Sequence, residues 1–318
     1  MSMLQRGVRR RISAVIVAAI GAVGLTGCQG PDLSGRADVI GAVLSAKPGV
    51  EDVKTQYQNG FDSGRSITYI VKMAAGATTA QSVEVAAALD QETGDEFDLY
   101  DQDLRLLLSG RVVEISDLTS SDIMADRASH LLALSSELSV SRLEWRQASE
   151  QTTFDDALEL SETQEDIFGM VNAVRAELGS EQFELRARDS AMTEWDVAFP
   201  YSEQAQGRLE TAVEPHLGQV KKVAIDDSQV SRLSVVVPDG VDVVSRLRGI
   251  IERIDSADAR PWEFDWALGS DPTGAVDPST KGSVNVAGCE YNEDPDRQMT
   301  SAAQTTQDQL RRIYDTCS

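Results

Sequence analysis

The sequence predicts an α+β fold made of tandem helix–strand–strand repeats, which form antiparallel sheets with the helices on one face. Apolar residues recur at helical spacing in several stretches, and two short runs of alternating apolar and polar residues follow each stretch. Turn-forming residues separate the paired runs, and the whole order recurs six times from residue 32 onward.

Candidate helix starts recur at similar intervals along the chain. Thr78 and Gln81 fit a capping box, in which each side chain bonds the backbone N–H of the other residue. The full set of candidate N-caps is Asp32, Thr78, Ser120, Thr163, Ser202 and Asp239.

Each predicted helix has one apolar stripe. Ile167, Met170, Val171, Val174 and Leu178 follow the i, i+3, i+4, i+7, i+11 spacing, and similar stripes occupy 124–138, 205–213 and 244–254. A single apolar face per helix predicts that each helix lies on a flat apolar surface.

The alternating runs predict the strands that supply this surface. Period-two alternation places one side of each strand in the core and the other in water. Ser109 and Gly110 are few enough to join two strands directly as a hairpin. The predicted strands with the clearest alternation are 67–73, 104–108, 183–187, 195–199, 233–237 and 262–268.

The N-terminus has the features of an export signal. Four arginines and no acidic residue precede an apolar run from Ile12 to Gly24, which is too short to span a bilayer. The segment Leu25-Thr26-Gly27-Cys28 resembles the lipobox of bacterial lipoproteins. The resemblance implies that the thiol of Cys28 takes a diacylglyceryl group and that the chain is cut just before it. An ordinary cleaved signal, and export by either the general or the twin-arginine route, remain alternatives.

Two helix–strand–strand units give a four-stranded sheet with two helices, an order similar to the ferredoxin-like sandwich in a shifted frame. Pairing the units gives three domains, although a βαββαβ frame would move each boundary by about half a unit. The predicted division is 1–27 for the signal peptide, 28–31 for the lipid anchor and linker, 32–118, 119–201 and 202–290 for three α+β repeat domains, and 291–318 for an acidic loop and a C-terminal helix.

The composition is strongly acidic, with 29 basic against 52 acidic residues and a net charge of −23. Cleavage before Cys28 would remove four arginines and lower the net charge to −27. A surface this acidic argues against binding to nucleic acid or to anionic lipids by charge alone. We therefore expect attachment to the extracytoplasmic face of the cell membrane through lipid.

Cys289 and Cys317 are the cysteines left after lipidation of Cys28. An even pair in an oxidising compartment predicts a disulfide that clips the terminal helix over the last sheet. The alternative is two separate thiols.

No segment of the sequence predicts catalysis. The chain has two histidines, His130 and His216, and neither has partners at metal-ligand spacing. Nucleophile elbows, phosphate-binding loops and dinucleotide fingerprints are absent from the sequence. We therefore expect no enzyme, cofactor or metal.

The polar sides of two predicted strands carry alternating charges. These could be cross-strand ion pairs that keep the sheet soluble, or a sheet face that receives a partner. The candidate residues for a binding face are Arg142, Glu144, Arg146, Glu184, Arg186 and Arg188.

Together these features predict a lipid-anchored, non-enzymatic surface lipoprotein, a repeat scaffold that binds an extracellular protein, peptide or envelope polymer. A solute-binding lipoprotein that delivers a small ligand to a transporter is one alternative. A hydrolase of the envelope that uses paired carboxylates is another.

Overall fold

A computed structural model provides the structure of the chain. It describes residues 31–60, 64–118, 124–147, 156–161, 166–179, 181–189, 192–238, 240, 242–254, 261–269, 276–289 and 298–316. Cys28, Cys317, Ser120, Thr163 and Asp239 lie outside these residues.

The described chain alternates one helix with two strands, as predicted. In chain order the elements are α1 (Ser34–Ser45), β1 (Val50–Gly60), β2 (Gly64–Met73), α2 (Thr79–Glu92), β3 (Asp101–Leu108), β4 (Arg111–Leu118), α3 (Met124–Glu137), β5 (Arg142–Gln147), β6 (Asp156–Ser161), α4 (Ile167–Leu178), β7 (Phe183–Arg188), β8 (Glu194–Phe199), α5 (Glu203–Val213), β9 (Val220–Asp226), β10 (Gln229–Val237), α6 (Val243–Ile254), β11 (Trp262–Leu268), β12 (Lys281–Val286) and α7 (Ser301–Tyr314).

The strands form one sheet in which they lie side by side in chain order, from β1 to β12. Within a unit the two strands are antiparallel, as predicted; β3 and β4, for example, are joined at Ser109-Gly110. Between units the neighbouring strands are parallel, as in β4 with β5. The cause is the connecting helix, which returns the chain to the end of the sheet where the previous strand began. A ferredoxin-like sandwich instead splits its βαβ unit, so the likeness is limited to the order of the elements.

The boundaries predicted after residues 118 and 201 fall between paired strands, β4 with β5 and β8 with β9. The sheet is therefore continuous across both positions. The predicted domains correspond to pairs of repeats along this sheet, and their independent folding stays a prediction.

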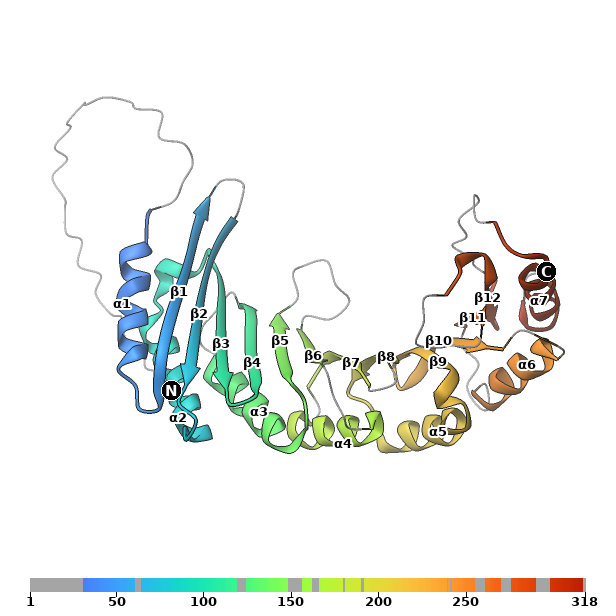
Figure 1. The fold of residues 1–318 in the computed structure, drawn as a ribbon, viewed down its shortest axis with the longest axis horizontal. Helices are drawn as coiled ribbons and strands as arrows, with labels where there is room; N and C mark the ends of the chain where they lie inside the picture. The colour runs from blue at the N-terminus through green and yellow to red at the C-terminus, as the bar shows by residue number, and fades with distance from the viewer. Residues whose placement is uncertain are drawn as a thin grey trace, which may run out of the picture.

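The sheet bends into an open arch with the helices on its outer side (Figure 1). A helix is about 10–12 Å wide, whereas two strands span only about 9.5 Å. Because each unit places one helix over two strands, the helix layer is wider than the strand layer. The sheet therefore curves with the helices on the convex side.

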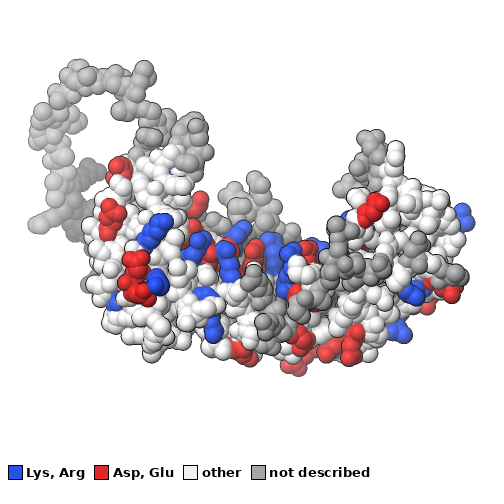
Figure 2. Space-filling view, in the orientation of Figure 1, with Lys and Arg blue, Asp and Glu red and all other residues white. Residues whose placement is uncertain are grey.

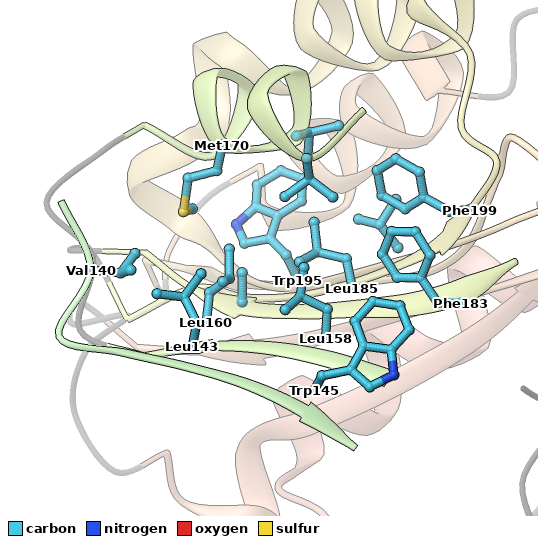
Figure 3. Packing of buried hydrophobic residues seen from close by; sticks show 14 of the residues in the cluster. Val140, Leu143, Trp145, Leu158, Leu160, Met170, Phe183, Leu185, Trp195 and Phe199 are labelled. Atoms are coloured by element: carbon cyan, nitrogen blue, oxygen red, sulfur yellow. The ribbon is translucent and has the colours of Figure 1, made fainter. Parts of the chain in front are cut away.

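Large apolar side chains fill the space between the sheet and the helices. Trp145, Phe183 and Trp195 are almost fully buried, and Met170 of α4 points from the helix layer toward the sheet (Figure 3). The ring of Phe183 stacks on that of Phe199 with centroids 4.6 Å apart. The alternation seen in the sequence therefore fixes which side of each strand meets the helices.

The helix starts agree with the predicted caps where these are described. Thr78 and Gln81 form the complete capping box of α2, and the Ser202 hydroxyl caps α5. The carboxylate of Asp32 accepts a hydrogen bond from the N–H of Ser34, although the cap position of α1 is Leu33. The N-cap of α4 is Asp166, three residues after the predicted Thr163.

Candidate functional site: the open face of the sheet

The side of the sheet opposite the helices, called here the open face, carries rows of charged side chains. No helix in the described part of the chain covers it, and Lys and Arg side chains gather across the strands on the inner side of the arch (Figure 2). The six predicted binding-face residues all lie here, because they alternate with residues buried against the helices: Arg142, Glu144 and Arg146 on β5, and Glu184, Arg186 and Arg188 on β7.

Strand register aligns the charges into one line, called here the inner row. Each member lies directly opposite the next across a strand pair. The row runs from β3 to β11 through Arg105, Glu114, Glu144, Glu159, Arg186, Asp196, Ala224, Arg232 and Glu263.

At the β3–β5 end, two carboxylates are enclosed by three arginines. Glu114 accepts bonds of 2.6 Å from Arg105 and of 2.6 Å from Arg142. Glu144 accepts bonds of 2.7 Å from Arg142 and of 2.6 Å from Arg146. The side chains of Glu114 and Glu144 are only 5% and 7% exposed, because the arginine stems cover them. Replacing Glu114 would remove a carboxylate that binds Arg105 and Arg142, and replacing Glu144 would remove one that binds Arg142 and Arg146.

This enclosure sets the charge state of Glu144. Burial alone would raise the pKa of its carboxyl, but the guanidinium groups of Arg146 and Arg142 and the hydroxyl of Ser116 bond the ionised form and hold the pKa below its ordinary value. Arg105 donates a hydrogen bond to Glu114, and this bond raises the pKa of the Arg105 guanidinium. A carboxylate held ionised in this way is poorly suited to act as a general acid.

At the β7–β11 end the charges form single pairs, or a group of two acids around Arg232, and they are more open to water. Arg188 binds Glu194 at 2.5 Å, and Lys222 binds Asp196 at 2.5 Å. Arg232 lies 2.7 Å from Asp265. Exposed ion pairs of this kind contribute little stability, with a median of about 0–1 kcal/mol.

The predicted binding face contained two of the nine residues of the inner row, Glu144 and Arg186. Arg105 and Glu114 each lie between apolar neighbours in a strand, so the period-two alternation could have indicated them. Arg232 follows Ser231, so its alternation is weaker. Their alignment depends on the register between strands of different units, which the sequence does not encode locally.

The two histidines lie away from this face. The Nδ1 of His130 lies 2.9 Å from Glu177, and this contact joins α3 to α4. Burial and the nearby Arg253 lower the pKa of His216. Within the described ranges, no three His, Cys, Asp or Glu residues are grouped to hold a metal ion.

No family model, curated protein or solved structure matches this chain. No helix among the described residues has both the length and the hydrophobicity needed to span a membrane.

Proposed function

We propose that this protein is a non-enzymatic scaffold, exported and anchored through lipid on Cys28 to the extracytoplasmic face of the cell membrane, that binds a protein, peptide or envelope polymer on its open face. The observation that carries this proposal is the contrast between the two sides of the sheet. One side is covered by helices from end to end, while the other presents charged side chains on strand after strand. The strands form one continuous sheet. Such a surface favours a scaffold over a solute-binding protein, which would hold its ligand in a cleft between two lobes.

Contacts near the proposed anchor hold the chain to the first hairpin. The carbonyl of Pro31 accepts hydrogen bonds from Asn59 at 3.2 Å and from the hydroxyl of Tyr100 at 3.4 Å. The N–H of Leu33 donates to the hydroxyl of Tyr57 at 2.9 Å. These bonds tie the first described residues to β1 and to the start of β3.

A short tether follows from these contacts. Cys28 precedes Pro31 by three residues, which span at most about 10 Å when extended. A lipid on Cys28 would therefore hold the β1–β2 end of the sheet next to the bilayer. Two acyl chains anchor a protein stably, so no charge attraction to the membrane is needed.

The anchor is tested by replacing Cys28 with Ser. We expect the protein to leave the membrane fraction, or to keep its signal peptide, and its mass to lack the diacylglyceryl group. A Cys28→Ser protein that is processed and still sediments with membranes would refute the anchor.

The binding face is tested by site-specific cross-linking in cells that make the full chain. A photoreactive residue at Ala224, on β9 in the inner row, should cross-link an envelope component. The same residue at Thr211, exposed on α5 on the opposite side of the sheet, should cross-link far less. Equal cross-linking from both positions would contradict the proposal.

A further inference from the structure

The open face is hollowed at its C-terminal end. The hollow has a volume of about 540 Å³, and strands β7 to β12 supply most of its lining. Its charged lining includes Arg188, Lys221, Lys222, Arg232 and Lys281.

Positive charge is concentrated there in an otherwise acidic protein. The described lining has five cations against two acids, Glu194 and Asp265, whereas the whole chain has 29 basic against 52 acidic residues. Asp196 binds Lys222 and Glu263 binds Arg232 from outside the lining. Three of the six lysines of the chain line this one hollow.

A β-bulge brings two consecutive lysines to the hollow. Ser234 of β10 pairs with Lys222, while the next residue, Val235, pairs with Val220, so the register between β9 and β10 shifts by one residue at Lys221. In a regular strand, successive side chains point to opposite faces, but a bulge re-aims one of them. The bulge explains why Lys221 and Lys222 line the same hollow.

We propose that this hollow binds a phosphate group of an anionic ligand. The proposal rests on the scaffold function above and names the chemistry of its ligand. A phosphate ester carries up to two negative charges and three acceptor oxygens, which suits several lysine ammonium groups at once, whereas a carboxylate suits a single arginine. The lysines and arginines on the rim can each contact a different oxygen.

The ligand can extend beyond the phosphate. A second hollow of about 620 Å³ lies over β6 to β8 and shares Arg188, Met192 and Glu194 with the first. Met192 is 51% exposed at this shared border and offers an apolar contact between the two hollows. The described lining of the second hollow has four acids against two arginines, so the phosphate group itself suits the first hollow and the second would take an uncharged or cationic part of the same ligand.

The test is calorimetric titration of the full lipidated chain in detergent with inorganic pyrophosphate and with a glycerol phosphate oligomer. A Lys221→Gln/Lys281→Gln variant should bind at least tenfold more weakly. The matched control, Lys54→Gln/Lys72→Gln, removes the same charge from β1 and β2 and should stay within twofold of the wild type. Binding of pyrophosphate alone would support a small phosphate compound as ligand, and binding of the oligomer alone would support a polymer.

Three results would overturn the phosphate assignment. They are no binding by the wild type, equal weakening in both variants, and binding of a uronic acid polymer in place of the phosphate compounds. Thermal unfolding of both variants shows whether the fold is intact, and Lys281→Gln alone replaces the double variant if it is not. Cross-linking from Ala224 reports the scaffold function separately, because it does not depend on phosphate chemistry.

Discussion

The two ends of the open face carry the same alternation of charge and differ in what surrounds it. Around β3–β5, Glu114 and Glu144 are 5% and 7% exposed beneath their arginines. Around β7–β11, Glu194 is 47% exposed and Asp196 25% exposed. The first region is closed by its own ion pairs, and the second is hollowed and open to a ligand.

The number of cations per acid accounts for part of this difference. Three arginines surround two glutamates at the β3–β5 end, and their long stems cover the sheet between them. Toward β11 the pairs are mostly single, and the small residues Ala224 and Ser234 stand between them. Charge alternation alone therefore does not define a binding face. The size of the side chains and the ratio of cations to acids decide whether the surface stays open.

The largest predicted effect concerns the C-terminal end. Backbone hydrogen bonds from Ala287 to Tyr314 and from Thr316 to Gly288 place the end of α7 beside the residue before Cys289. A disulfide between Cys289 and Cys317 would clip α7 onto β12, and its loss should destabilise the protein by about 3 kcal/mol. Intact mass before and after reduction and alkylation tests whether the bond forms.

The same reduction sharpens the comparison between the two ends. Hydrogen exchange in β11 and β12 should rise after reduction, whereas β3 to β5 should keep their protection. Two thiols in freshly purified, unreduced protein would eliminate the disulfide, and a uniform rise in exchange would show that the clip is not local.

The next effect separates the enclosed acids from the open ones. Glu144→Gln removes charge-assisted bonds to Arg142 and Arg146 in a buried setting and should cost about 2 kcal/mol. Glu184→Gln, on the same face and paired with Arg186 in a more exposed setting, should cost about 0.5 kcal/mol. Urea unfolding measures both changes, and equal costs would refute the division of the open face into two regions.

The sequence was sufficient to predict the repeating unit and the buried side of the strands with the clearest alternation. Phe183, Leu185 and Ala187 alternate with charged residues in the sequence and are buried in the structure. Local periodicity is enough for this, because a side chain's face depends only on its own strand. The parallel pairing of neighbouring units was not predicted, because it depends on where each helix returns the chain.

The candidate site was predicted only in part for a related reason. Arg142, Glu144 and Arg146 were identified from one strand, but Glu114, which binds Arg142, lies in the preceding unit together with its other partner, Arg105. The hollow depends on a bulge at Lys221, and no turn or glycine marks that bulge in the sequence. Long-range register and a single extra residue therefore determine the part of the site that periodicity leaves out.

The smallest effect is a pH dependence of opposite sign at the two ends of the inner row. The arginines lower the pKa of Glu144 despite its burial, so its contribution to stability is present above the unfolded pKa and is lost as the pH falls through the folded one. Burial and the neighbouring Asp265 raise the pKa of Glu263 above 4.5, so its contribution is present below the unfolded pKa and is lost as the pH rises through the folded one.

Substitution of each acid by glutamine should expose this difference. The destabilisation caused by Glu144→Gln should be largest at pH 7 and shrink as the pH falls through the lowered pKa of the folded state, where the wild-type carboxylate becomes protonated. Glu263→Gln should instead gain stability relative to the wild type as the pH rises from about 4 to 7, because glutamine avoids the ionisation that the folded state disfavours. Urea midpoints measured across this range for both variants decide the matter. Parallel pH profiles for the two variants would mean that both ends of the row hold their acids in the same way, which the different exposures of Glu144 and Glu263 argue against.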